Sequence, residues 1–438
     1  MIQFIILLLC HLHFIHAKNL IHLNDLFSPK SNIGSASYRI GSKPLKVPFI
    51  SKPVIRKVGT LPASYQAETL VGTVGIGTPP QNMTILFDTG STVFWARSAG
   101  CLTPSCWGKP NYNALLSSTY KSLPRNKDNQ VSLRYGDGTT VLCNVNQDTV
   151  TIAGIKIENQ NLCEANFILS NDIALDGLIG IGAPKSVNGS AEVLKTMIDQ
   201  NLIDEPKISF WYNVTDLPGG GNNFADGTGG EIIFGSIDSQ RFTGSITNVP
   251  LTSNRKYWSV MMNGIKVGDG PNLVFTPSST VIDTGTTLTY LPVALFNRIN
   301  SEINARIVDD YYVLDCDRLP TLKPIIFDLG NLVTRLTPAQ YTIRDAPTGL
   351  CVLTIQPVPE DVGIGSIIGA LFLKQYYVIF DYGGEQIGFA TPTYEKIKPK
   401  PSPTPSTGGK QADESKSNHG FKSNLDAFIF MTVLFALV

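Results

Sequence analysis

Leu86-Phe87-Asp88-Thr89-Gly90-Ser91-Thr92 returns downstream as Val281-Ile282-Asp283-Thr284-Gly285-Thr286-Thr287. In each copy two large apolar residues precede an Asp, which predicts a buried strand with a carboxylate at its end, and the Gly allows a sharp turn. A second echo follows each copy, at Asp176-Gly177-Leu178-Ile179-Gly180 and at Ser366-Ile367-Ile368-Gly369. The chain therefore predicts two related halves, each with a strand, an acidic turn, a long excursion and an apolar-apolar-Gly segment.

Length and composition indicate two mainly β domains. The chain has 438 residues and a formal net charge of zero, and roughly 340 residues remain without its atypical ends, which is enough for two domains. Frequent Gly and Pro, with many Val, Ile, Thr and Tyr, favour short strands over long helices. Helix candidates are few, and they include Ser190–Asn201, where the apolar spacing is helical, and a short helix at Leu295–Ile303. No long basic run occurs in the body, so no nucleic-acid partner is expected.

The histidines exclude several hydrolytic mechanisms. All of them lie near the ends of the chain, at His11, His13, His16, His22 and His419. A body without histidine excludes Ser–His and Cys–His nucleophiles and zinc sites built on histidine. No metal or cofactor is expected, and carboxylates acting on water remain as the hydrolytic chemistry. Glycosidases also use two carboxylates, but they do not require paired Asp-Thr-Gly loops.

From about Ala67 to Ala390 the chain resembles pepsin-like aspartic endopeptidases. The resemblance rests on both triplets and on Gly75-Ile76-Gly77-Thr78-Pro79-Pro80-Gln81, Trp95, Tyr135-Gly136-Asp137-Gly138, Phe234-Gly235-Ser236-Ile237-Asp238 and Phe372-Leu373-Lys374-Gln375-Tyr376-Tyr377. It implies a mainly β, bilobal acid-protease fold with the active-site cleft between two homologous lobes. The expected substrates are proteins or peptides.

The resemblance implies a catalytic dyad of Asp88 and Asp283. Two adjacent carboxylates cannot both ionise cheaply, so they share a proton, and aspartic proteases are the standard example of such a pair. One carboxylate acts as general base on a water while the other donates to the scissile carbonyl oxygen. At this level either Asp could hold the proton.

Neighbouring residues receive roles from the same resemblance. Ser91 and Thr286 are expected to hydrogen-bond the outer carboxylate oxygens, and Thr89 and Thr284 to tie the two loops together. The expected substrate-binding residues are Gly90, Tyr135, Gly136, Asp137, Gly285 and Thr286. The hairpin with Tyr135 at its tip would be the flap over the substrate, with Trp95 as the hydrogen-bond neighbour of Tyr135. An ordinary surface hairpin with a buried Tyr is the alternative.

Six cysteines lie in the body, at Cys101, Cys106, Cys143, Cys163, Cys316 and Cys351, and they permit fifteen pairings. Chain proximity favours Cys101 with Cys106, and the family pattern supports this pair and Cys316 with Cys351. Cys143 with Cys163 then remains by elimination and would join strands flanking a hairpin at Ala153-Gly154. Three disulfides fit the secretory route, whereas six reduced thiols would indicate a cytosolic protein.

Composition divides the chain into segments. We expect residues 1–17 to be a signal peptide, with a retained anchor as the alternative. Residues 18–57, which end in the dibasic pair Arg56-Lys57, are expected to be a propeptide, with a simple disordered leader as the alternative. The catalytic lobes are expected at 58–243 and 244–395, followed by a Pro/Ser/Lys-rich stalk at 396–424. The apolar tail at 425–438 is shorter than the roughly 20 residues of a spanning helix and matches a glycolipid (GPI) attachment signal. A tail helix retained in the membrane is the alternative.

Location and partners follow from these ends. Asn82, Asn188 and Asn213 begin glycosylation sequons. The stalk and tail resemble those of fungal cell-surface members such as yapsins. We therefore expect a monomer that passes through the secretory pathway and is anchored by its glycolipid at the plasma membrane or cell wall. The competing hypothesis is a catalytically silent pepsin-like surface binding protein.

Overall fold

The computed structural model describes residues 59–66, 69–136, 138–170, 175–186, 192–213, 229–253, 256–274, 276–308, 310–345, 348–358 and 365–394. The expected signal peptide, propeptide, stalk and tail lie outside these residues, as do Asp137 and Asn188. All of the described residues belong to one compact unit. Within the described ranges, no helix has the length and apolar content needed to cross a membrane.

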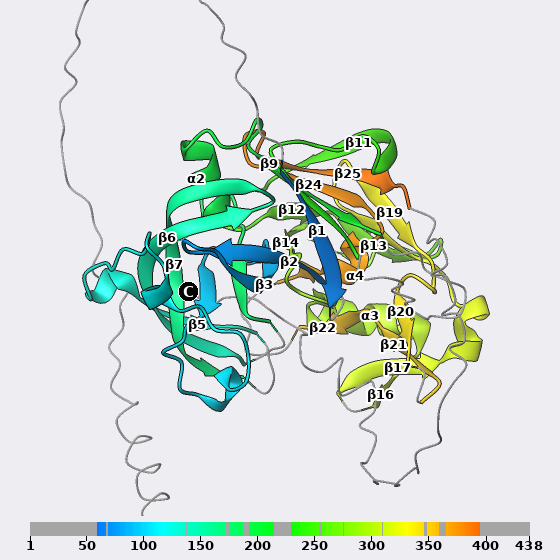
Figure 1. Ribbon diagram of the computed structural model, residues 1–438. Coiled ribbons are helices and arrows are strands. Elements are labelled where there is room, and N and C mark those ends of the chain that lie inside the picture. Colours follow the sequence, from blue (N-terminus) through cyan, green and yellow to red (C-terminus); the bar gives the residue numbers. More distant parts are fainter. Residues whose placement is uncertain are drawn as a thin grey trace, which may run out of the picture. The chain divides into compact units, whose positions relative to one another are not determined.

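Strands dominate the described residues, as the composition predicts (Figure 1). The strands of the first half are Gly59–Gln66 (β1), Thr69–Ile76 (β2), Gln81–Asp88 (β3), Phe94–Arg97 (β4), Gln130–Arg134 (β5), Thr140–Ile152 (β6), Ile155–Leu169 (β7), Gly177–Gly180 (β8), Lys207–Tyr212 (β9) and Gly230–Phe234 (β10). Its helical segments are Pro104–Cys106 (η2), Ala114–Leu116 (η3), Lys127–Asn129 (η4) and Val193–Asp199 (α2).

The second half is built in the same manner. Its strands are Phe242–Pro250 (β11), Ser259–Met262 (β12), Gly264–Val267 (β13), Ser278–Ile282 (β14), Thr289–Leu291 (β15), Arg306–Val308 (β16), Tyr311–Asp315 (β17), Ile325–Asp328 (β18), Val333–Leu336 (β19), Thr342–Arg344 (β20), Leu350–Leu353 (β21), Ile355–Pro357 (β22), Ile367–Ile368 (β23), Tyr377–Asp381 (β24) and Gln386–Pro392 (β25). Its helical segments are Val293–Ile303 (α3), Cys316–Thr321 (η5) and Ala370–Leu373 (α4).

The two predicted helices are present but differ in extent from the prediction. α2 begins at Val193 and ends at Asp199, inside the predicted range. α3 begins two residues earlier than predicted and ends at Ile303. Asn304 follows α3 with a left-handed backbone (φ 56°), which stops the helix, and its amide still bonds to the Asn300 carbonyl.

Each half places its two echoed motifs side by side. β3 pairs in parallel with β8, so that Asp88 lies opposite Gly180. β14 pairs in parallel with β23, so that Ile282 lies opposite Ile368. β8 and β23 are buried throughout, which explains why their sequences are short continuous apolar runs rather than alternating ones. The apolar-apolar-Gly segment is thus the partner strand that supports each acidic turn.

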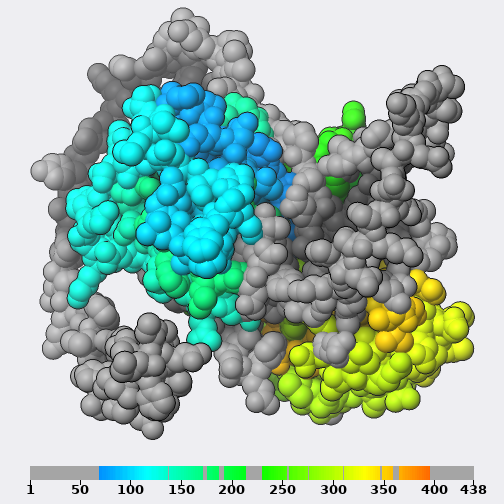
Figure 2. Space-filling view, turned by 60° about the horizontal axis from the view of Figure 1, so that its bottom comes forward, coloured from blue at the N-terminus to red at the C-terminus, as the bar shows by residue number. Residues whose placement is uncertain are grey.

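The two halves share a sheet. β9 of the first half pairs with β24, β24 pairs with β25, and β25 pairs with β11. Figure 1 shows β9, β24 and β25 together, and Figure 2 shows the cyan residues of the first half and the yellow residues of the second on separate sides of the molecule. Phe380 of β24 packs edge-on against Phe210 at 5.6 Å and Trp258 at 5.1 Å between ring centroids. The closing strands therefore bury aromatic side chains from both halves in one core.

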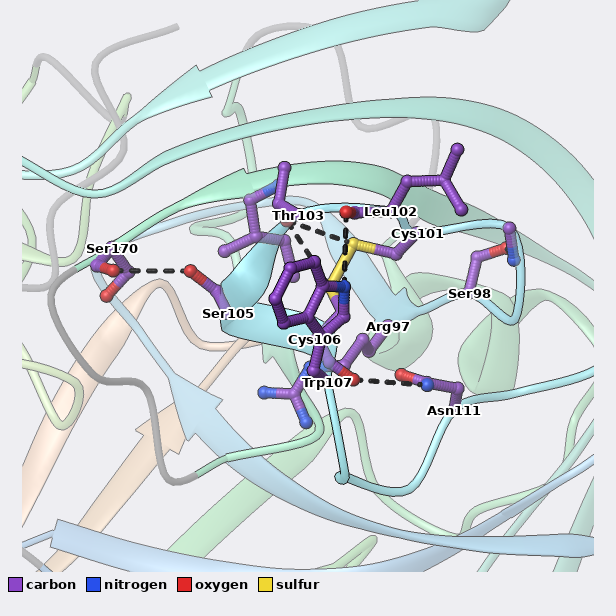
Figure 3. Close-up of a disulfide and its surroundings, with 12 residues drawn as sticks. Arg97, Ser98, Cys101, Leu102, Thr103, Ser105, Cys106, Trp107, Asn111 and Ser170 are labelled. Atoms are coloured by element: carbon purple, nitrogen blue, oxygen red, sulfur yellow. Dashed lines mark hydrogen bonds between the residues drawn. A yellow bond between two sulfur atoms is a disulfide. The ribbon is translucent and has the colours of Figure 1, made fainter.

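The structure confirms all three predicted disulfides, Cys101–Cys106, Cys143–Cys163 and Cys316–Cys351. The second links β6 to β7 across a turn at Ala153 and Gly154, which both have positive φ, as a two-residue hairpin requires. Figure 3 shows the loop closed by the first disulfide, where Ser105 Oγ donates to Ser170 O and the Ile168 amide donates to Thr103 Oγ1. These bonds hold the loop against the end of β7.

Candidate active site

Asp88 and Asp283 stand at the ends of corresponding strands. Asp88 is the last residue of β3, and Asp283 directly follows β14. The partner strands fix both backbones, because the Ile181 amide donates to Asp88 O at 2.7 Å and the Asp283 amide donates to Ile368 O at 2.9 Å. Both side chains are fully buried. The repeat therefore delivers two carboxylates to one site.

Each carboxylate accepts equivalent hydrogen bonds from its own loop. Asp88 Oδ1 accepts from the Gly90 amide at 2.8 Å, and Asp88 Oδ2 accepts from the Ser91 hydroxyl. Asp283 Oδ1 accepts from the Gly285 amide at 2.8 Å, and Asp283 Oδ2 accepts from Thr286 Oγ1 at 2.6 Å. The predicted bonds from Ser91 and Thr286 are thereby confirmed. The two loops orient their carboxylates by the same pattern.

Gly90 and Gly285 each lie against the opposite carboxylate. A Cβ on Gly90 would lie 2.5 Å from Asp283 Oδ2, and a Cβ on Gly285 would lie 2.6 Å from the carboxyl carbon of Asp88. The sequence assigned these glycines to contact with substrate. In the structure, the loops could not bring the carboxylates together with any larger residue at either position.

Thr89 and Thr284 tie the loops together, as predicted. The Thr89 amide donates to Thr284 Oγ1 at 3.1 Å, and the Thr284 amide donates to Thr89 Oγ1 at 3.0 Å. Each hydroxyl also donates to the backbone of the other half, Thr89 Oγ1 to Ile282 O at 2.9 Å and Thr284 Oγ1 to Phe87 O at 2.7 Å. All four bonds are buried, so they fix the spacing of the two carboxylates.

Replacing Thr89 by Val is expected to lower the free energy of unfolding by about 2–6 kcal/mol, because the Thr284 amide and the Ile282 carbonyl each lose their buried hydrogen bond to the hydroxyl, at about 1–3 kcal/mol each. The measurement is chemical denaturation at fixed pH. Thr89→Ser keeps the hydroxyl and serves as the control, with a much smaller loss. Equal losses in the two variants would show that the hydroxyl bonds do not stabilise the fold.

The electrostatics of the site favour a proton shared by the two carboxyl groups. Burial raises the pKa of Asp88 well above its ordinary value of 3.8, and the charge of Asp283 and the hydrogen bond between the two carboxyl groups raise it further. Burial also raises the pKa of Asp283, but the hydrogen bonds from Asp88 and Thr286 oppose that rise. The pair therefore keeps one shared proton to a higher pH than an isolated carboxyl group would.

These shifts predict that the fold loses stability as the pH rises. A carboxyl group whose pKa is higher in the folded than in the unfolded chain stabilises the fold fully below the unfolded pKa of about 3.9, and this contribution disappears as the pH rises through the folded pKa. We expect the Tm to fall from acid towards neutral pH, and Asp88→Asn to weaken that dependence. Thermal unfolding of both proteins over this pH range measures it. A parallel dependence in wild type and Asp88→Asn would contradict the raised pKa of Asp88.

Tyr135 is held at the tip of the β5–β6 hairpin. Its hydroxyl accepts a hydrogen bond from Trp95 Nε1 at 2.7 Å, which confirms the predicted pair, and both side chains are buried. Trp95 lies on β4, which pairs with β8, and β8 pairs with β3. Gly136 is described and half-buried, whereas Asp137 lies outside the described residues. The hairpin is therefore connected to Asp88 through two strands.

Two further contacts at the site were not predicted from the sequence. The buried Arg97 forms an ion pair with Asp176 at 3.3 Å and donates to Leu175 O at 2.5 Å, while Asp176 Oδ2 accepts from the Thr84 amide at 2.8 Å. Trp258 Nε1 of the second half donates to Ile181 O of the first at 2.8 Å. The one signal for this ion pair in the sequence was Arg97 itself, a lone cation on the apolar strand that also contains Trp95.

Two of the three sequon asparagines lie in the described residues. Asn82 is exposed on β3, and Asn213 is half-buried directly after β9. Glycosylation requires an exposed side chain, so of these two predicted acceptors Asn82 fits the requirement better.

Comparisons with known proteins agree with this geometry. Residues 69–392 match the family model described as eukaryotic aspartyl protease. Cathepsin E-B of Xenopus laevis is 32% identical over 336 residues, covering 75% of this chain and 80% of that protein. Napsin-A of Mus musculus is 34% identical, covering 72% and 75%, and probable vacuolar protease A of Trichophyton verrucosum is 32% identical, covering 72% and 77%.

A solved structure supports the fold. The crystal structure of aspartic proteinase from Irpex lacteus matches with a TM-score of 0.65 and 23% sequence identity, covering 77% of this chain and 98% of that one. The mainly β, bilobal prediction is therefore confirmed, while the yapsin-like subtype stays a prediction. With the family model spanning both acidic turns, the chain belongs to the eukaryotic aspartyl protease family, whose members are aspartic endopeptidases.

Proposed function

We propose that the chain hydrolyses peptide bonds through a water activated between Asp88 and Asp283. The observation that carries this proposal is the pair of buried, mutually hydrogen-bonded carboxylates, each oriented by equivalent bonds from its own loop and each lying against the glycine of the opposite loop. The body contains no histidine, and all six of its cysteines are in disulfides, so a carboxylate pair is the chemistry that remains for activating water.

In this proposal Asp283 is the base and Asp88 the acid of a pair that keeps one proton, because burial raises the pKa of both carboxyl groups. Ionised Asp283 accepts a proton from the water as it attacks the scissile carbonyl carbon, and protonated Asp88 donates to the carbonyl oxygen. The resulting tetrahedral intermediate breaks down when the leaving amine takes a proton from the dyad. No covalent intermediate with the protein forms. Asp88 and Asp283 are catalytic residues in this proposal, and Gly90, Gly285, Thr286 and the Tyr135 hairpin with Gly136 and Asp137 contact the substrate.

The test is cleavage of a denatured protein substrate from acid to neutral pH, with and without the aspartic-protease inhibitor pepstatin. Activity should be highest in acid, because it requires the proton held by Asp88, and it should fall as the pH rises through the raised pKa of Asp88. Pepstatin should abolish it. Activity that increases towards neutral pH, or that resists the inhibitor, would contradict the proposed mechanism.

We further propose that the protein acts on extracellular proteins at the cell surface, as a monomer held by a glycolipid anchor. Three disulfides support the secretory route, because such bonds persist in oxidising compartments. The apolar C-terminal tail supports the anchor. Phospholipase specific for glycolipid anchors should release the protein from membranes, while a version ending at Pro392 should be found in the medium. Retention on membranes after the phospholipase would overturn the anchor.

A further inference from the structure

The outer face of the β6–β7 hairpin carries a polar pocket of about 90 Å³. Its floor is formed by side chains of β6 and β7, including Asn144, Asn146 and Glu164, and its wall by the segment Tyr120–Arg125. None of these residues belongs to the dyad or to its hydrogen-bonding loops. The pocket is therefore separate from the candidate active site.

The base of the pocket is rigid. Glu164 is buried and accepts from Asn146 Nδ2 at 2.6 Å and from the Tyr120 hydroxyl. Asn146 Oδ1 accepts from the Leu123 amide at 2.9 Å, which fastens the wall to the floor. Glu164 and Asn146 thus satisfy each other and hold the pocket open.

Two amide side chains in the pocket are unused. Asn144 and Asn166 both line it and are half-buried, and neither forms a side-chain hydrogen bond with another described residue. Asn144 lies opposite Glu164 in the register. Asn166 is the extra residue of a β-bulge, because Ala165 pairs with Cys143 and Phe167 with Leu142. A bulge re-aims a side chain, and here it adds a second free amide to the pocket.

The charges favour a neutral ligand. Among the lining residues, Arg125 is the one cation and Glu164 the one carboxyl group. The two charges are of opposite sign, so the pocket has little net charge. A lone carboxyl group is too few ligands for a metal ion. A free amide can both donate and accept a hydrogen bond, which suits hydroxyl groups, because these also do both.

Apolar side chains continue the same face. Leu142 and Phe167 pair across β6 and β7 next to the pocket, and they are 42% and 39% exposed. The half-buried ring of Tyr120 lies in the wall. Exposed apolar side chains beside a polar pocket indicate a binding surface. A sugar ring presents both a hydroxylated edge and an apolar C–H face, which matches this combination.

We propose that the pocket formed by Tyr120–Arg125 and the β6–β7 hairpin binds a neutral hexose residue, with the amides of Asn144 and Asn166 on its hydroxyls and Phe167 beneath its C–H face. The sugar could be free or part of a glycoprotein glycan, since the terminal ring is the same. This binding is independent of the proposed hydrolysis, because no residue is shared with the dyad.

The test is saturation-transfer NMR with methyl glycosides of glucose, mannose and galactose and with N-acetylglucosamine. It uses the full-length protein after enzymatic removal of its own N-glycans. At least one sugar should receive saturation. The Asn144→Ala/Asn166→Ala double variant should bind that sugar at least about tenfold more weakly than wild type. Neither substitution breaks a bond within the described residues, so the fold should be unaffected. Asn161→Ala, on β7 but outside the pocket lining, is the matched control and should bind as wild type does.

A binding experiment distinguishes the two sources of the sugar. A glycoprotein and its deglycosylated form are each captured on a surface, and binding of this protein to each is measured. The protein carries Asp88→Asn so that it does not cleave the captured glycoprotein. Binding that requires the glycan and disappears in the double variant supports glycan recognition, and binding of the free glycosides alone supports a free sugar. Absence of saturation for every sugar, or equal binding by wild type and the double variant, would overturn the site whether or not the protein is a peptidase.

Discussion

Asp88→Asn and Asp283→Asn are each expected to lower kcat for peptide-bond cleavage by roughly 10²- to 10⁴-fold, the range lost with one acid–base group. An amide in place of the Asp88 carboxyl group could neither hold nor deliver the shared proton, and an amide in place of the Asp283 carboxylate could not accept one from water. Both variants should fold, because an amide carries no charge into a site where burial already disfavours ionisation. The measurement is steady-state cleavage in acid, with circular dichroism to confirm the fold.

Asp269→Asn is the matched control, because Asp269 is exposed on the turn after β13 and should leave kcat unchanged. Retained activity in either dyad variant would remove the dyad from the mechanism. A correctly processed wild type that cleaves nothing at any pH would favour the catalytically silent binding protein.

Much of this site could be predicted because its geometry is local. Each Asp receives its hydrogen bonds from residues two and three positions further along, so the seven-residue repeat contains nearly the whole arrangement. The partner strands could also be identified, since an apolar-apolar-Gly echo follows each acidic turn at a similar interval, with Gly180 92 residues after Asp88 and Gly369 86 residues after Asp283. Even the Thr89–Thr284 contact follows once two similar loops face each other.

The remaining features depend on contacts between distant segments. The pairing of β9 with β24 joins Phe210 to Val378, and nothing in the local pattern of either strand specifies its partner. The sharing of the proton depends on the burial of the pair and on the charge of Asp283 beside Asp88. Only the folded site defines these two causes. The bulge at Asn166 needs the β6–β7 register, because its sequence alone is that of an ordinary strand.

Gly90→Ala and Gly285→Ala test whether the close approach of the two loops matters. The added methyl group of Gly90→Ala would lie 2.5 Å from Asp283 Oδ2, well inside van der Waals contact, and Gly285→Ala would crowd Asp88 in the same way. The carboxylates cannot move aside freely, because Thr286 and Ser91 hold them and the Thr89–Thr284 bonds hold the loops. Relief of this clash needs a displacement of about 1 Å, which should separate the groups that share the proton, and a misplacement of about 1 Å lowers kcat about 100-fold.

Gly365→Ala is the matched control for these variants, since a Cβ there would meet nothing closer than Ser279 O at 3.9 Å. The clash also predicts a weaker proton coupling, so in both alanine variants the pH at which activity falls should move towards acid, because a more distant Asp283 charge raises the pKa of Asp88 less. A lower kcat with an unchanged pH profile would show that the methyl groups obstruct the substrate instead, which is the role that the sequence assigned to these glycines. The pH profile therefore separates the two explanations.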